Sequence, residues 1–466
     1  MANTHLDSAQ TDQIMPSVAF LTLGCAKNEV DSARMTRQVR NAGYQVVQDL
    51  SAADAVIVNT CCFIQPATEE SIDTIFEICG LPNFAQGSAK LIVAGCMPAR
   101  YGDDLAESLP EARAFVPCSR EDDIVGVLGG LFGTQDTSAH VHDACLPQCS
   151  AQELVSAVEA VAPYDMYGQA NVATFVKISD GCDRFCSFCA IPFIRGAYHS
   201  FTLEDICNTV EQRIAEGARE ITLIAQDTGR WGEDFNPPLT TAFLLDTLAQ
   251  RFSNVWFRLM YIEPEGITDE LLGVIRNHEN VCNYLDMPLQ HASAKVLTDM
   301  NRKGCGEQFI ALIEHIRDMV PEITLRTTLI AGFPGETDED FGELMDFLEE
   351  AELDYVGVFP YSLEEGTAAA LMDDQLEEDI KIDRAQEVRD LCDTISMARV
   401  QQRIDSTVRV LVIGYEEDGQ LFGRAECQAP EVDGVIYLDQ GTPGEFVTVK
   451  VIDTFAYEME GDVIRG

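Results

Sequence analysis

Short apolar runs alternate with amphipathic segments along residues 17–131 of the chain. Runs of five or six apolar residues predict strands, and the segments between them repeat their apolar positions at helical spacing. The expected strands are residues 18–23, 55–60 and 91–95. The expected helices are residues 31–41 and 68–79, with Asp31 and Thr68 near their amino-terminal caps. This alternation predicts a parallel sheet that helices cover on both faces.

The alternation resumes after residue 170 and continues to about residue 362. Six strands are expected there, each followed by a helical segment: residues 173–178, 220–225, 255–261, 283–286, 324–330 and 355–359. Six such units predict an incomplete (β/α)8 barrel, whose functional residues sit at the carboxyl ends of the strands. A charged amphipathic segment at residues 376–404 is expected to close this domain as a helix or a helix pair.

The pattern changes after residue 405 to short alternating strands, which predict a small β-barrel. These strands are expected at residues 407–413, 421–425, 434–438 and 446–455. The fold class is therefore α/β with an appended small β-barrel. The predicted parts are a disordered leader (1–16), an α/β domain (17–131), a linker (132–169), a partial (β/α)6 barrel (170–404) and a β-barrel (405–466).

The composition is that of an ordinary globular protein, with 46% hydrophobic and 23% charged residues. No apolar run approaches the roughly 20 residues of a membrane span. The first residues lack the basic and apolar regions of a signal peptide, so we expect a cytoplasmic protein with no membrane partner. The net charge of −47 disfavours direct binding to nucleic acid and would suit a basic protein partner. General acidity for solubility explains the charge equally well.

Sixteen cysteines without a secretory signal indicate reduced thiols or metal ligands. Cys182, Cys186 and Cys189 form a C-x3-C-x2-C triplet just after the first strand of the expected barrel. Closed metal sites use four protein ligands, so a triplet suggests a [4Fe-4S] cluster with one iron open to a small molecule. Three buried thiols that happen to cluster are the alternative.

Three further cysteines follow the three strands expected in the first domain: Cys25, Cys61 and Cys96. The carboxyl ends of the strands share one edge of an open parallel sheet, and ligands bind there. The fold could thus bring these distant cysteines together. Alternatively, cysteines are simply frequent in this domain, which also holds Cys62, Cys79 and Cys118.

Several other polar residues are weaker candidates. By residue type, His140, His142, Cys145 and Cys149 could form a zinc site in the linker, but their spacing fits no compact motif. We therefore expect them to be non-essential. Polar residues at other strand ends could contact a ligand, or could merely cap helices and solvate loops: Gln226, Asp227, Glu263, Asp286 and His291.

The segment from Gly181 through Cys189 to Pro192 resembles the loop of the radical S-adenosylmethionine (SAM) superfamily. The segments 23–28, 59–61 and 95–97 match the three cysteine sites of the methylthiotransferases within that superfamily. The order of domains also resembles theirs, the last being similar to a TRAM domain. The resemblance implies that Cys25, Cys61 and Cys96 hold one [4Fe-4S] cluster. It likewise implies that Cys182, Cys186 and Cys189 hold a second cluster that binds SAM, with Phe188 as a residue that could contact SAM.

Within this family, the chain is most similar to the branch that modifies an aspartate of ribosomal protein S12. Residues 285–291 and 361–367 and the G-C-A-K-N form around Cys25 carry that similarity. Ala26 stands where the family favours proline, Cys62 stands where it favours glycine, and residues 197–201 lack the usual arginines. Because residues 197–201 lack these arginines, the resemblance does not assign the contacts around the loop of Cys182, Cys186 and Cys189.

The resemblance implies a radical reaction, because no side-chain base can ionise the unactivated aspartate β-carbon. It implies two [4Fe-4S] clusters, two SAM molecules, a sulfur donor and a reducing electron donor such as a flavodoxin or ferredoxin. The acidic β-barrel is expected to meet the basic surface of ribosomal protein S12. Two other functions stay open: a methylthiotransferase acting on a tRNA adenosine, and an iron–sulfur electron-transfer or redox-sensing protein.

Overall fold

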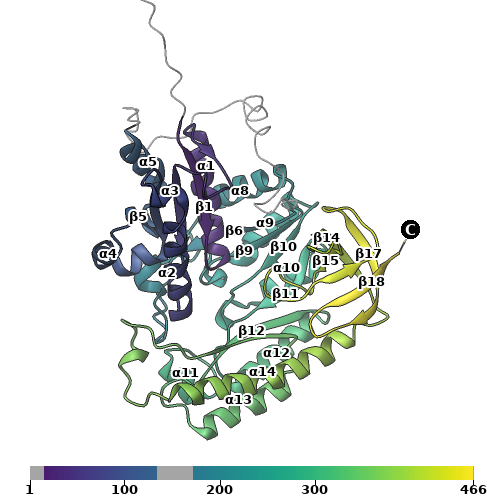
Figure 1. The fold of residues 1–466 in the computed structure, drawn as a ribbon. Coiled ribbons are helices and arrows are strands. Elements are labelled where there is room, and N and C mark those ends of the chain that lie inside the picture. Colours follow the sequence, from purple (N-terminus) through teal and green to yellow (C-terminus); the bar gives the residue numbers. More distant parts are fainter. Residues whose placement is uncertain (1–14, 134–171, 465–466) are drawn as a thin grey trace, which may run out of the picture. The chain divides into compact units, whose positions relative to one another are not determined.

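The computed structural model describes residues 15–133 and 172–464 (Figure 1). They fall into two compact units, the first within residues 1–144 and the second within residues 145–466. The linker residues His140, His142, Cys145 and Cys149 lie outside the described residues, so their non-essential role stays a prediction. In residues 15–133 and 172–464, no helix is long and apolar enough to cross a membrane.

The first unit contains a five-stranded, fully parallel sheet with strand order β2-β1-β3-β4-β5. The strands are β1 (Ser17–Thr22), β2 (Gln45–Val46), β3 (Ala55–Thr60), β4 (Lys90–Gly95) and β5 (Ala112–Pro117). The main helices are α1 (Ala26–Asn41), α2 (Gln65–Cys79), α4 (Cys96–Ser108) and α5 (Ile124–Phe132). Ile57 and Ile92 of the sheet pack with Met35 of α1 and Leu128 of α5. The parallel α/β fold predicted for this region is confirmed.

Helix starts and edge strands of the first unit differ from the prediction. Helices α1 and α2 begin earlier than expected, and their N-terminal caps are Cys25 and Ile64. The expectation that Asp31 and Thr68 lie near the caps is wrong, because the carbonyl of Cys25 already accepts the first helical hydrogen bonds. Asp31 is fully buried inside α1. Strands β2 and β5 were not predicted, since both are edge strands with few buried apolar residues.

The second unit is built on a six-stranded parallel sheet with strand order β13-β12-β11-β10-β9-β6. The strands are β6 (Ala173–Lys177), β9 (Glu220–Ile224), β10 (Trp256–Leu259), β11 (Val281–Asp286), β12 (Thr324–Ala331) and β13 (Tyr355–Pro360). The main helices are α8 (Leu203–Ala215), α9 (Thr241–Arg251), α10 (Asp269–Asn277), α12 (Gly306–Met319), α13 (Asp338–Ala351) and α14 (Glu378–Gln401). The predicted (β/α)6 arrangement is confirmed, and the segment at residues 376–404 forms the single helix α14.

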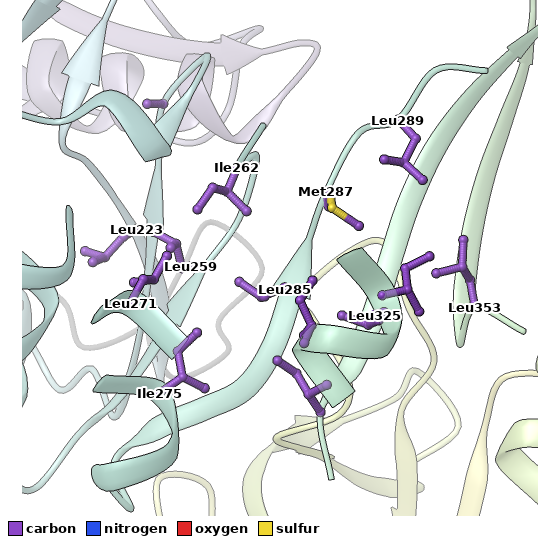
Figure 2. Close-up of a cluster of buried hydrophobic side chains, with 14 of the residues drawn as sticks. Leu223, Leu259, Ile262, Leu271, Ile275, Leu285, Met287, Leu289, Leu325 and Leu353 are labelled. Carbon is purple, nitrogen blue, oxygen red and sulfur yellow. The ribbon is translucent and has the colours of Figure 1, made fainter. Parts of the chain in front are cut away.

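The two faces of this sheet differ in chemistry. Leu259 of β10 is in register with Leu223 of β9 and Leu285 of β11. These leucines pack with Leu271 and Ile275 of helix α10 in one buried cluster (Figure 2). Because side chains alternate along a strand, the residues between these leucines point to the other face. Those residues include the buried polar side chains of Arg258, Asp286 and Arg326.

The last part of the second unit is a closed five-stranded barrel in the order β14-β15-β16-β18-β17. Its strands are β14 (Thr407–Tyr415), β15 (Leu421–Ala425), β16 (Ile436–Leu438), β17 (Phe446–Thr454) and β18 (Met459–Val463). The barrel was predicted, but strand β18 was not, because its sequence of Met, Glu, Gly, Asp and Val carries little apolar signal.

Buried polar contacts join this barrel to the six-stranded sheet. Glu220, the first residue of β9, accepts hydrogen bonds from Arg258 (2.8 Å) and from Arg424 of the barrel (2.7 Å). Tyr284 donates to Asp433 at 2.7 Å, and Trp256 packs edge-on against Phe446. Glu220 and Trp256 are the first residues of their strands. The barrel therefore contacts the amino ends of β9 and β10, whereas the cysteine triplet follows the carboxyl end of β6.

Candidate functional site: two sets of three cysteines

The cysteine triplet lies on a loop that is closed at its base. The loop follows β7 (Ser179–Asp180), which pairs with β8 (His199–Ser200) in antiparallel register. The backbone N–H of Cys182 donates to the carbonyl of Gly196 at 3.0 Å. Gly181 adopts φ +77°, and a Cβ there would lie 2.2 Å from the carbonyl oxygen of Ala197. Only glycine fits this crossing of the two loop ends.

Asp180 anchors the base of the loop. Its carboxylate accepts hydrogen bonds from Lys177 (2.7 Å), Gln226 (3.0 Å) and Arg195 (3.4 Å). Burial would raise the pKa of Asp180, but the positive charges of Lys177 and Arg195 outweigh it and hold that pKa well below its usual range. Asp180 therefore stays ionised and ties strand β6, the end of the cysteine loop and the end of β9 together.

The three thiols of the loop are each partly buried. Burial raises the pKa of all three thiols, that of Cys189 to about 12, and the neighbouring thiols Cys186 and Cys182 raise it further. Iron binds thiolates, so cluster assembly here must release protons. Among residues 15–133 and 172–464, no three His, Cys, Asp or Glu side chains are arranged to hold a single metal ion. The triplet fits a cluster better than a single ion, because a cluster places each thiolate on a separate iron.

The other polar residues at the strand ends have partners within the protein. Asp227 pairs with Arg184 at 2.7 Å, and Glu263 pairs with Arg302. His291 is fully buried and its Nδ1 accepts from the backbone N–H of Ser293 at 2.9 Å, as expected for a structural histidine. Phe188 is half-buried and packs against the hydrophobic core, so its contact with SAM stays a prediction.

The first unit places its three predicted ligands at one edge of its sheet. Cys25 lies shortly after β1, Cys61 directly after β3 and Cys96 directly after β4, and these three strands are neighbours. The strand order reverses between β1 and β3, and ligands of open α/β sheets bind at the carboxyl ends of strands at such a point. The position of the three cysteines thus matches the binding edge of this fold.

Asn28 holds the three cysteine segments together. Its side-chain amide donates to the carbonyls of Leu23 (2.8 Å) and Thr60 (3.0 Å), while its oxygen lies 3.7 Å from the sulfur of Cys96. Gly24 packs so closely that a Cβ there would lie 3.0 Å from the sulfur of Cys61. One buried side chain therefore fixes the spacing between three segments that are far apart in the sequence.

Two further cysteines lie at the same edge. Cys118, directly after β5, has its sulfur 3.9 Å from that of Cys96. Cys62 is fully buried, and burial together with the neighbouring thiols Cys96 and Cys61 raises its pKa strongly. Frequent cysteines alone would not predict this placement, because only Cys79 of this unit, at the end of α2, lies elsewhere among residues 15–133.

Two residues that contact cysteine sulfurs in these sets were not recognised from the sequence. Asn28 stands inside the G-C-A-K-N motif, so its nearness to Cys25 was a usable signal. Arg302 lies 3.9 Å from the sulfur of Cys186 but is 116 residues away along the chain. No local pattern of hydrophobic or polar positions could have connected these two residues.

Three family models match consecutive parts of the chain. The uncharacterized protein family UPF0004 matches residues 17–117, the radical SAM superfamily residues 176–348 and the TRAM domain residues 404–464. The chain is 39% identical to the ribosomal protein uS12 methylthiotransferase RimO of Natranaerobius thermophilus, over 96% of this chain and 98% of that protein. It is 38% identical to the protein of the same name from Geobacter sulfurreducens, with the same coverage of both chains.

Solved structures agree with the fold. The radical S-adenosylmethionine methyltransferase TsrM from Kitasatospora setae superposes with a TM-score of 0.53 at 14% identity, over 75% of this chain and 73% of that chain. The radical enzyme OxsB gives a TM-score of 0.50 at 13% identity, over 82% of this chain and 56% of that chain. At such identities the likeness concerns the fold alone.

The partial barrel, its cysteine loop and the superfamily match define a radical SAM enzyme. Within this class, the chain shares 38–39% sequence identity with two methylthiotransferases over almost the whole length of both chains. The chain belongs to the RimO-type methylthiotransferases, as the sequence motifs indicated. An electron carrier or redox sensor without a substrate is thereby excluded.

Proposed function

We propose that this enzyme attaches a methylthio group to the β-carbon of one aspartate in ribosomal protein uS12, with two [4Fe-4S] clusters and two SAM molecules. The observation that supports the proposal is that two separate sets of three cysteines each follow the carboxyl ends of parallel strands. The name shared by the relatives supports the substrate. We also propose that the enzyme works in the cytoplasm.

In this proposal, Cys182, Cys186 and Cys189 hold the cluster that binds SAM. When bound, this cluster supplies the electron that cleaves SAM and so begins the radical reaction. Asp180 keeps the loop at the end of β6, and Phe188 offers an apolar surface beside the last two cysteines. A flavodoxin or ferredoxin is the proposed source of electrons.

Cys25, Cys61 and Cys96 hold the other cluster, and a sulfur donor supplies the atom to be transferred. Three protein ligands at each site leave one position for a small molecule, which both SAM binding and sulfur binding require. Asn28 is the residue that keeps the three ligands of this site in place.

The C-terminal barrel supports a basic protein as the substrate. RNA-binding modules present basic side chains with exposed aromatic residues. Between residues 407 and 464, each of the three basic side chains is already engaged. Arg409 stacks on Phe446, Arg424 is buried against Glu220, and Lys450 pairs with Asp405. The same segment carries exposed acids, including Glu416, Glu445 and Glu460. Such a surface attracts a basic partner rather than RNA.

The test is mass spectrometry of uS12 and of bulk tRNA from cells that lack this gene. We expect uS12 to lose the mass of one methylthio group and the tRNA nucleosides to stay unchanged. If uS12 keeps its mass and a methylthio-adenosine disappears from tRNA, the substrate is tRNA and the proposal is wrong.

A further inference from the structure

Residues 299–302, at the end of helix α11 (Ala294–Asp299), contact the cysteine loop along its backbone. Ser187 donates from its hydroxyl to the carbonyl of Asp299 (2.7 Å) and from its N–H to that of Met300 (3.0 Å). Asn301 donates its side-chain amide to the carbonyls of Arg184 (3.1 Å) and Phe185 (3.0 Å). We call residues 299–302 the loop clamp. It contacts every residue from 184 to 187, including Cys186.

Arg302 is the charged member of the loop clamp. Its side chain is only 7% exposed, and one nitrogen lies 3.9 Å from the sulfur of Cys186. The same nitrogen donates to Glu263 at 2.6 Å, and the second terminal nitrogen donates to the carbonyl of Pro288 at 2.5 Å. With these partners, the planar guanidinium is held in one orientation, which a flexible ammonium group could not reproduce.

The loop is also held from the other side. The N–H of Ala369, in the segment after β13, donates to the carbonyl of Ser187 at 2.7 Å. Ser187 itself is buried. Because Cys186 directly precedes a residue fixed from two directions, the position of its sulfur is set by segments far from the C-x3-C-x2-C motif.

Arg302 and Glu263 place opposite charges near one sulfur ligand. Reduction adds an electron to a cluster, so a positive charge or an N–H donor beside its sulfur raises the reduction potential. A nearby carboxylate lowers it, and both effects are strong in a site screened from water. Removing the charge of Arg302 should therefore lower the reduction potential of the cluster, and removing the charge of Glu263 should raise it.

We propose that the loop clamp positions Cys186, and that Arg302, balanced by Glu263, sets the reduction potential of the cluster bound by this loop. This inference rests on the proposed function, in which Cys182, Cys186 and Cys189 hold a [4Fe-4S] cluster. Arg302 is thus a positioning residue, since it acts through Cys186 rather than on the substrate.

The test measures the midpoint potential of this cluster by redox titration followed by electron paramagnetic resonance. The full-length chain carries Cys25→Ala, Cys61→Ala and Cys96→Ala, so that only the loop cluster is present. We expect Arg302→Met to shift the potential to more negative values and Glu263→Gln to shift it to more positive values. Arg302→Lys, which keeps the charge, should shift it less than Arg302→Met. A role in folding alone would not produce shifts of opposite sign.

Arg213→Met is the matched control, because Arg213 is also largely buried against a glutamate, Glu216, on helix α8. It should leave the potential unchanged. If Arg302→Met takes up no iron, Glu263→Gln and Arg302→Lys still decide the question. Unchanged potentials, or shifts of the same sign in Arg302→Met and Glu263→Gln, would overturn the role of Arg302. Absence of any cluster in the parent chain would instead refute the proposed ligands.

Discussion

The two cysteine sites use the same number of thiols in very different surroundings. Cys182, Cys186 and Cys189 share one loop, beside charged groups such as Asp180 and Arg302. Cys25, Cys61 and Cys96 come from three strand ends, and the neutral side chains of Asn28 and Ser71 bond to their segments. One charged side chain, Arg100, also bonds there, to the carbonyl of Cys62 at 2.6 Å. Charges near a cluster and hydrogen bonds to its sulfurs change its potential, whereas hydrogen bonds to the backbone of a ligand segment chiefly fix its position. The charged group beside a ligand sulfur of the loop site agrees with the proposed function, in which the loop cluster transfers an electron and the strand-end cluster holds the atom to be transferred.

The first prediction removes the loop site. The triple change of Cys182, Cys186 and Cys189 to Ala should abolish both SAM cleavage and methylthiolation. The wild type should bind about eight irons per chain and the variant about four, because each site holds one four-iron cluster. Iron analysis and chromatography of 5′-deoxyadenosine measure these outcomes. A variant without any iron would show that the sites are not independent.

The second prediction weakens the strand-end site without touching a ligand. Asn28→Ala leaves the buried carbonyl of Thr60 without its amide donor, at a cost of about 1–3 kcal/mol for that unsatisfied group, and removes a second hydrogen bond to the partly buried carbonyl of Leu23. Iron should fall from about eight toward about four per chain, with SAM cleavage retained.

Asn83→Ala is the matched control for this change. Asn83 also bridges two carbonyls of the first unit, those of Leu50 and Ala53, but it does not belong to a cysteine segment. This control should lose a similar amount of stability and keep its iron. If both variants lose iron equally, Asn28 has no specific role at the site.

The smallest effect is expected for the additional cysteine at the strand-end site. Cys118→Ser should keep the full iron content and the methylthiolation rate within about twofold, with Cys79→Ser as the control, since three thiolates suffice for a cluster with one open iron. A loss of iron specific to Cys118→Ser would show that Cys118 is a fourth ligand. The two sites would then differ in their number of cysteine ligands.

The sequence predicts features that depend on neighbouring residues much better than features that depend on distant ones. The cysteine loop was recognisable because its ligands and its glycines are contiguous. The six strands of the second unit were found because strand-like and helical patterns alternate there, although β6 and β13 are only partly buried. Strands β5 and β18 were missed, because one is an edge strand and the other is mostly polar.

The partners of the cysteines were beyond prediction for the same reason. Arg302 reaches Cys186 only because helix α11 ends beside the loop, and Cys118 approaches Cys96 only because β5 is the neighbour of β4. The attachment of the barrel through Glu220 and Arg424 likewise joins residues 204 positions apart. Such contacts are properties of the folded chain.

In the proposed function, the two cysteine sites divide the reaction between them. The most direct measurement compares two products in one reduced sample of the variant Cys25→Ala, Cys61→Ala, Cys96→Ala, supplied with SAM and uS12. We expect 5′-deoxyadenosine to form at a rate similar to that of the wild type, while the mass of uS12 stays unmodified. Formation of methylthiolated uS12, or loss of 5′-deoxyadenosine with the loop cluster still present, would contradict the division of roles.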